Sequence, residues 1–410
     1  MTEKTLKIYG RSDVATAILL TYCSPLRFTF QGMDLPRGWM DILIIGDTRC
    51  GKSAVAEAIV AGIKMGEFFT CENVSFAGLV GGLQQMGSKN KWDICWGKMP
   101  INNGKLLVAD EMSSLPIDAI GNMSGVRSSG VAEISKVQGG IARAACRMIW
   151  ISNPRSELDM SSYPHGVRAI PELIGRPEDI ARFDLALGLR RSDVPLETIN
   201  AITPDAIEND PKWDNLRVLV KWAWRLRPND VEFTPDAVHL ILRYATDMAK
   251  KYHASIPLVE PNEQRVKIAR VSAATAVRCF SEHCGRLVVK PQHVEFATWF
   301  MQKCFDSHGL MYNQYSDAMR YNTEMHVENT IALRDTFQRV GANKQSVQAL
   351  HFMDIFGAYD VEHILDVPKS DARTLLSMMI RFGILSKTPR GYRKTPLGVE
   401  SLGAVLETME

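Results

Sequence analysis

Three short runs of mainly apolar residues mark the first half of the chain, at 41–45 (DILII), 105–109 (KLLVA) and 147–152 (RMIWIS). Runs of this length are typical of strands that are buried on both faces of a parallel sheet. Helical segments lie between them, so the pattern predicts a doubly wound α/β domain that extends to about residue 210. In such a domain, ligands bind at the carboxyl ends of the strands.

After residue 211 the pattern changes to helices without a strand signal, and Thr234 is placed to cap one of them. A polar stretch then leads to a third unit, in which three short helices precede two strands joined by a turn that contains glycine. This order is typical of a winged helix, a fold found in DNA binding and in protein contacts. The predicted organisation is an α/β domain at 1–210, a helical region at 211–308, a linker at 309–328 and a winged helix at 329–410.

The first apolar run leads directly into a glycine-rich loop and then a helix. The loop reads G-x-x-x-x-G-K-S, and in this context it predicts binding of a nucleoside triphosphate. Backbone N–H groups would close around the phosphates, Lys52 would reach the β- and γ-phosphates, and the Ser53 hydroxyl could ligate Mg²⁺. The predicted ATP-binding residues are Gly46, Asp47, Thr48, Arg49, Cys50, Gly51, Lys52 and Ser53.

The other two apolar runs end in polar residues that suit phosphate chemistry. Asp110 could hold Mg²⁺, and Glu111 is placed to orient or deprotonate the attacking water. Asn153 would lie between these carboxylates and the γ-phosphate, as a sensor of that phosphate. The alternatives are an acidic pair that only caps a strand and an asparagine that only begins a turn before Pro154.

Arg182 lies beside an aromatic residue and just before a further apolar run, LALGL. An arginine there could reach the γ-phosphate of a neighbouring subunit and stabilise the charge that develops during transfer. It could equally form a surface ion pair with Asp184 or Asp193, and the spacing does not decide between the two.

Composition narrows the setting. The 48 basic and 46 acidic residues leave a net charge of only +2, so any surface for nucleic acid must be local. The eight cysteines are scattered without a C-x-x-C pair, which favours a reducing compartment without a structural metal site. The apolar stretches are too short to span a bilayer and the amino terminus has no signal-peptide character, so we expect a cytoplasmic protein without a membrane partner.

The order of these motifs resembles that of the AAA+ ATPases, and the sequence around them is similar to that of the minichromosome maintenance (MCM) replicative helicases. IYGRSDVATAILL at 8–20 resembles the opening helix of that family, and AEISKVQGG at 132–140 resembles its hairpin before the sensor strand. The likeness covers roughly residues 7–300. It implies an AAA+ core with β-hairpin insertions, an all-α lid and a carboxy-terminal winged helix.

The resemblance also implies how the site is completed. Lys52, Ser53, Asp110, Glu111 and Asn153 would act within one subunit with ATP and Mg²⁺. Arg182 would come from the adjacent subunit of a homo-oligomeric ring, usually a hexamer. A second arginine, on the lid, would also cross the interface; Arg265 is our first choice and Arg270 the reserve.

Two hairpins are expected to meet DNA. In the family the hairpin that carries Lys136 points into the central channel, where copies from every subunit would form a positive collar against DNA phosphates. Lys89 and Lys91, at the tip of the other insertion, are weaker candidates. Without a ring, a lone lysine at a turn is more often just solvated.

The winged helix offers further basic residues on its presumed recognition helix and wing. Clustered charge of this kind favours phosphate contact, although such domains also dock replication partners without reading DNA. The candidates for DNA contact here are Arg373, Arg390, Arg393 and Lys394.

The chain also departs from the family. Thr48, Arg49 and Cys50 stand where the loop of the family usually has small residues, and Gly51 stands where it often has an alanine. Neither change removes a phosphate ligand. The family places a DNA-binding, ring-organising domain before the ATPase, and only about seven residues precede the similarity here. We therefore expect a fragment, a compact relative, or a ring that assembles through the ATPase tier alone.

These features predict an ATP-dependent DNA translocase of MCM type that acts in replication, from a prokaryote, a mobile element or a virus. Its 3′-to-5′ polarity follows from the resemblance alone. Two alternatives stay open: an AAA+ remodeller of proteins related to the chelatases and MoxR-type chaperones, and a nucleotide-gated DNA-binding switch.

Overall fold

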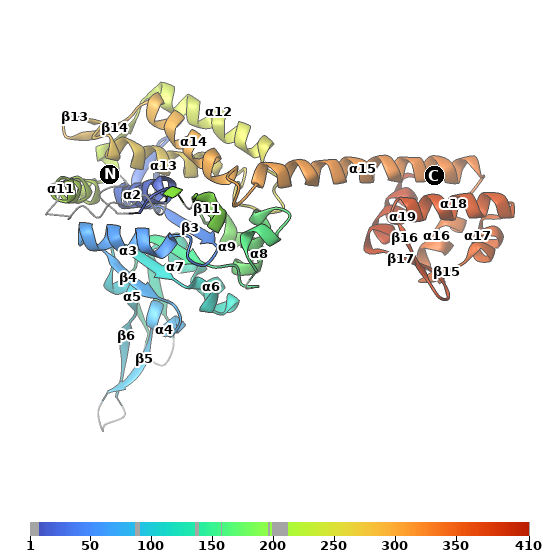
Figure 1. The fold of residues 1–410 in the computed structure, drawn as a ribbon, viewed down its shortest axis with the longest axis horizontal. Helices are drawn as coiled ribbons and strands as arrows, with labels where there is room; N and C mark the ends of the chain where they lie inside the picture. The colour runs from blue at the N-terminus through green and yellow to red at the C-terminus, as the bar shows by residue number, and fades with distance from the viewer. Residues whose placement is uncertain are drawn as a thin grey trace. The chain divides into compact units, whose positions relative to one another are not determined.

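The computed structural model describes residues 8–86, 91–135, 139–156, 158–195, 197–198 and 212–409. The chain divides into two compact units, Met1–Ser316 and Asp317–Glu410, each with its own hydrophobic core (Figure 1). They are described separately below.

A parallel sheet forms the centre of the first unit, as predicted. Within the described residues it has five strands in the order β11-β3-β10-β7-β4. The three apolar runs supply the middle strands, and their side chains are almost entirely buried. The strand bounds are β3 Asp41–Gly46, β4 Glu67–Thr70, β7 Leu106–Asp110, β10 Arg147–Ser152 and β11 Leu185–Leu189.

Helices pack on this sheet and alternate with its strands along the chain. Helix α2 (Ser12–Cys23) contacts β3 and β10 as well as α3 (Lys52–Ile63). The shorter elements are β1 Phe28–Phe30, β2 Met33–Leu35, α4 Phe76–Leu79, α5 Lys98–Ile101, α6 Ile117–Asn122, α7 Ser124–Ser129, α8 Ala169–Ile174 and α9 Pro177–Ala181.

Two β-hairpins interrupt the core. Strands β5 (Gly81–Met86) and β6 (Lys91–Trp96) form the first, which projects from the rest of the unit in Figure 1. Strands β8 (Val131–Ile134) and β9 (Gly140–Arg143) form the second. A Cβ atom at Gly140 would collide with Ile94 of the first hairpin, so the two hairpins pack closely. Residues 87–90 and 136–138, between the paired strands, lie outside the described part of the chain.

The helical region of the first unit contains α11 (Lys212–Arg225), α12 (Pro235–Lys251), α13 (Gln264–Arg278) and α14 (Pro291–Phe305). Thr234 caps α12 by accepting a hydrogen bond from Ala237 N. The expectation of helices without strands is wrong: β12 (Val231–Phe233), β14 (Arg286–Val289) and β13 (Glu282–His283) form a small sheet. These strands have two to four residues, too few to show a period in the sequence.

The second unit packs five helices around a three-stranded antiparallel sheet within its described residues. Helix α15 (Tyr312–Arg339) begins in the first unit, so residues 312–328 of the predicted linker are helical. The other elements are α16 Lys344–Phe352, β15 Ile355–Phe356, α17 Ala358–Leu365, α18 Lys369–Arg381, β16 Leu385–Thr388, β17 Gly391–Lys394 and α19 Pro396–Thr408. No helix in the described ranges is long and apolar enough to cross a membrane.

Candidate nucleotide-binding and catalytic site

The glycine-rich loop lies between the carboxyl end of β3 and the amino end of α3. Gly51, just before α3, has φ of 90°, a left-handed conformation that strains any residue with a Cβ atom. Arg49 also has a positive φ, of 61°. The loop therefore takes a tight path that ends with backbone N–H groups at a helix amino terminus, where phosphates bind well.

Lys52 folds back over this loop. Its Nζ donates hydrogen bonds to the Gly46 carbonyl at 2.9 Å, the Asp47 carbonyl at 2.7 Å and Asn153 Oδ1 at 2.8 Å. Burial lowers the pKa of the Lys52 ammonium, and the nearby Asp110 and Glu111 carboxylates oppose that effect. A buried ammonium ion held by carbonyl oxygens is ready to exchange those partners for phosphate oxygens.

Asp47 shapes the loop from inside. Its carboxylate accepts hydrogen bonds from Met160 N at 2.6 Å and Arg191 N at 2.8 Å, and its own N–H donates to the Leu189 carbonyl. Its polar groups are thus used within the protein, whereas Thr48 and Arg49 lie at the open part of the loop. The sequence placed Asp47 among the ATP-binding residues; the structure gives it contacts to the segments after β10 and β11.

Arg11 anchors the loop from outside, and the sequence analysis missed it. Its Nε donates to the Cys50 carbonyl at 2.7 Å, one terminal nitrogen pairs with Asp193 at 3.2 Å, and the other donates to the Arg190 carbonyl. Only its place in the segment that resembles the opening helix hinted at a role, because its partners lie far away in the sequence.

The two carboxylates follow β7, which β10 separates from β3 and its glycine-rich loop. Asp110 ends β7, and Glu111 follows with φ of 55°, a left-handed conformation. Glu111 N donates to Asp110 Oδ1 at 2.9 Å. Burial, and after it the charge of Asp110, raises the pKa of the Glu111 carboxyl group.

Asn153 connects the two sides because β10 pairs with both β3 and β7. A pocket of about 480 Å³ opens beside it, and Thr48, Glu111 and Asn153 all line it. The remaining lining residues are Asp47, Ser113, Ser114, Pro154, Arg155, Leu158 and Asp159. The predicted loop, carboxylate and sensor therefore meet at one place, at the carboxyl ends of the strands.

The family comparison agrees with this geometry. Residues 3–192 match the model of the MCM P-loop domain. This segment is an MCM P-loop domain. The match spans the loop, both carboxylates, Asn153 and Arg182, and it supports ATP binding and ATPase activity. No curated protein is similar enough to the chain to be identified as a relative.

Arg182 follows α9 of the MCM P-loop domain and is about a quarter exposed. It donates to the hydroxyl groups of Ser124 and Ser128 and pairs with Asp179 at 3.5 Å. Neither carboxylate named in the sequence analysis is its partner: Asp184 pairs with Arg37 and Arg270, and Asp193 pairs with Arg11. Arg182 does not line the pocket beside Asn153.

The two lid candidates lie in different environments, beyond the matched segment. Arg270 is buried, donating to the Arg37 carbonyl at 3.0 Å and pairing with Asp184 at 2.7 Å. Burial lowers the pKa of its guanidinium group. Arg265 is exposed in the first turn of α13. The buried contacts of Arg270 attach α13 to the core of the same unit, whereas Arg265 faces solvent.

The candidate DNA contacts are placed only in part. Lys89 and Lys136 lie outside the described residues, and Lys91 begins β6. Arg373 is exposed on α18, and Arg390 and Arg393 are exposed in and before β17. Lys394 differs from them: it is half-buried, and its ammonium donates to the His351 carbonyl.

Proposed function

We propose that this chain is an ATP-driven DNA translocase of MCM type, which assembles into a ring and hydrolyses ATP between subunits to unwind DNA during replication. The observation that carries the proposal is the contact between Lys52 and Asn153 beside Glu111, inside an MCM P-loop domain. This cluster can bind a triphosphate, sense its last phosphate and direct a water molecule toward it.

Hydrolysis would begin when the triphosphate replaces the carbonyl partners of Lys52. Glu111 would then orient the attacking water and accept its proton, while Asn153 donates its amide N–H to the γ-phosphate. Asp110 and Ser53 supply a carboxylate and a hydroxyl oxygen, the ligand type that suits Mg²⁺. The metal ion would neutralise charge on the phosphates.

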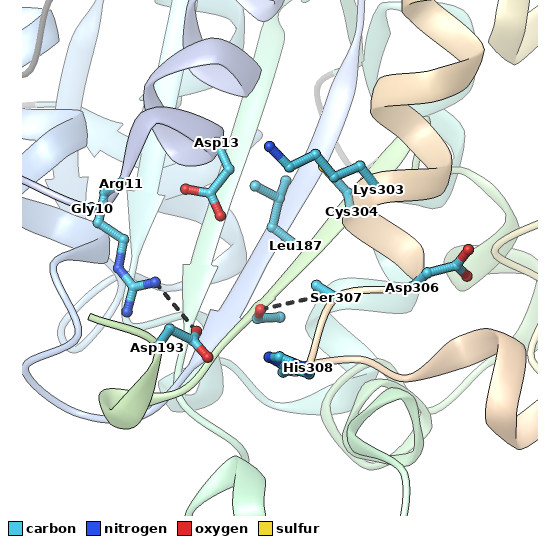
Figure 2. Close-up of a pocket in the computed structure, with 11 residues that line it drawn as sticks. Gly10, Arg11, Asp13, Leu187, Asp193, Lys303, Cys304, Asp306, Ser307 and His308 are labelled. Carbon is cyan, nitrogen blue, oxygen red and sulfur yellow. Dashed lines mark hydrogen bonds and ion pairs between the residues drawn. The ribbon is translucent and has the colours of Figure 1, made fainter. Parts of the chain in front are cut away.

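A second pocket could hold the base of the nucleotide. Its volume is about 480 Å³, and it lies between the start of α2 and the end of α14 (Figure 2). Figure 2 shows Arg11 at its wall, linked to Asp193, with Lys303, Asp306 and His308 on the opposite side. Because Arg11 also donates a hydrogen bond to the Cys50 carbonyl, a base bound in this pocket would act on the phosphate loop through Arg11.

The ring arrangement rests on two arginines that do not line their own pocket. The partly exposed Arg182 and the exposed Arg265 would reach the γ-phosphate of the next subunit. An arginine that completes a neighbour's site makes hydrolysis depend on assembly, which gives a motor its coordination between subunits.

DNA contact is proposed at two places. The hairpin with Lys136 would follow the strand through the ring by contacts to phosphates, which carry no sequence information. In the second unit, α16, α17 and α18 followed by the β16–β17 hairpin support a winged helix, with Arg373, Arg390 and Arg393 exposed for phosphate contact.

ATPase and strand-displacement assays with and without DNA test this function. We expect DNA to stimulate ATP hydrolysis and a forked duplex to be unwound only when ATP can be hydrolysed. Lys136→Ala should keep ATP binding and lose unwinding. Hydrolysis that does not respond to DNA would contradict the proposal and favour protein remodelling, and unwinding without hydrolysis would contradict a motor.

A further inference from the structure

Arg155 lies in the catalytic pocket, two residues after Asn153. One terminal nitrogen of its guanidinium group donates to the Ser113 carbonyl at 2.8 Å. The other donates to the carbonyls of Leu115 at 2.8 Å and Leu173 at 3.1 Å. All three partners are backbone oxygens, so Arg155 holds main chain in place.

The main chain it holds carries Glu111. Ser113 lies in the 3-10 turn Met112–Ser114, and Glu111 is the residue that caps the start of this turn. Glu111 has the left-handed φ of 55°, which a residue other than glycine keeps only where its surroundings enforce it. The direction of its carboxylate therefore depends on what fixes the turn.

A second contact fixes the same turn from the same strand end. Ser113 N donates to Ser152 Oγ at 3.0 Å, and Ser152 Oγ donates to the Asn153 carbonyl at 2.8 Å. Ser152 at the end of β10 and Arg155 just after it thus hold the N–H and the carbonyl of Ser113, two residues after Glu111. A movement of Asn153 would be transmitted to the turn by short, directional bonds.

We infer that Arg155 is a positioning residue for Glu111, holding the carboxylate where it orients water and linking it to Asn153. The inference rests on the proposed function, because it assigns a role within the same ATPase site. The bond to Leu173 extends the link to α8, which only residues 175 and 176 separate from α9, and Arg182 directly follows α9.

Two substitutions test the role. Arg155→Met removes all three bonds, and we expect kcat for ATP hydrolysis to fall about 10- to 100-fold with little change in KM, since small misplacements of a catalytic group have effects of this size. Arg155→Lys should lie between Met and the parent, because one ammonium group cannot reproduce the planar fork. If Arg155→Met does not fold, Arg155→Lys provides the test in its place.

Arg147→Met is the matched control. Arg147 starts β10 at its opposite end, and its buried guanidinium likewise donates to backbone carbonyls, those of Ser24 at 2.7 Å and Gly104 at 2.8 Å. Its loss should lower the melting temperature and leave kcat per folded protein unchanged. An equal fall of kcat in both variants would overturn the specific role of Arg155.

A double-mutant cycle separates positioning from general support. In a Glu111→Gln background, Arg155→Met should have almost no further effect on the residual rate, because the group that Arg155 positions is gone. An equal fold-loss in both backgrounds would overturn the inference while leaving the ATPase function intact. A parent chain without ATPase activity would overturn the proposed function, and the inference with it.

Discussion

Asn153 Oδ1 accepts a hydrogen bond of 2.8 Å from the Lys52 ammonium, which joins two residues that are 101 positions apart in the chain. The bond links the phosphate loop after β3 to the end of the adjacent strand β10. A γ-phosphate would enter between these groups and accept the hydrogen bond that the Lys52 ammonium now donates to Asn153. The presence of the triphosphate can therefore be sensed by whether this bond is made.

Asn153→Ala should separate sensing from binding. Lys52 keeps its two carbonyl partners and the loop keeps its shape, so nucleotide affinity should change little. Loss of a hydrogen bond to a charged group corresponds to about 1.5–3 kcal/mol, and kcat should fall about 10- to 100-fold. Equilibrium nucleotide binding and steady-state hydrolysis measure the two effects, and a loss confined to binding would contradict the sensor role.

Glu111→Gln should lower hydrolysis to a small residual rate and stabilise the fold at neutral pH. The raised pKa means that the folded protein disfavours the carboxylate, so its cost to stability develops as pH rises from the unfolded pKa through the folded pKa. The gain in melting temperature should be full above the folded pKa and vanish at low pH. Thermal unfolding of parent and variant from pH 3 to pH 8 checks this; a constant difference would contradict it.

The lid arginines should behave oppositely. Arg270→Met takes one of two ion-pair partners from the buried Asp184 and leaves Arg37, and breaking a buried pair costs about 3–5 kcal/mol, so the melting temperature should drop. Arg265→Ala should leave stability unchanged and lower hydrolysis only in the assembled ring. Unfolding curves and ATPase rates at several protein concentrations distinguish them. Unfolding of Arg265→Ala at the parent's midpoint together with full activity would remove Arg265 from the site.

The basic side chains of the second unit should act through phosphate contact. Arg390→Ala and Arg393→Ala should each lower the slope of log affinity against log salt by about 0.9 per lost contact, equally for different DNA sequences. Arg339→Ala, an exposed arginine at the end of α15, is the control that should leave the slope unchanged. Equal slopes in all three variants would argue for a protein partner at this unit.

Much of the first unit could be predicted because its signals are local. The apolar runs determine β3, β7 and β10, and the glycine and lysine spacing of the loop identifies a phosphate site. What failed depends on contacts between distant residues: Arg11 meets Asp193 across 182 positions, and Arg155 reaches back 42 positions to Ser113. No spacing rule encodes such partners.

Burial was the other property that the sequence could not provide. Arg265 and Arg270 lie on one helix with similar neighbours, yet only Arg270 is enclosed, because Asp184 and the Arg37 carbonyl approach it from the core. Lys394 and Arg393 are both basic residues of β17, but the Lys394 ammonium donates a hydrogen bond to the His351 carbonyl.

The most direct test of the account is mixing two inactive variants. Lys52→Ala removes the cation from its own site, and Arg182→Ala removes the one lent to the neighbour, so each alone should lose hydrolysis. Mixed rings contain interfaces with an intact Lys52 on one side and an intact Arg182 on the other, and ATPase activity should return on mixing. Arg182→Ala that hydrolyses ATP at the parent's rate, or a mixture that stays inactive although mixed rings form, would contradict a site shared between subunits.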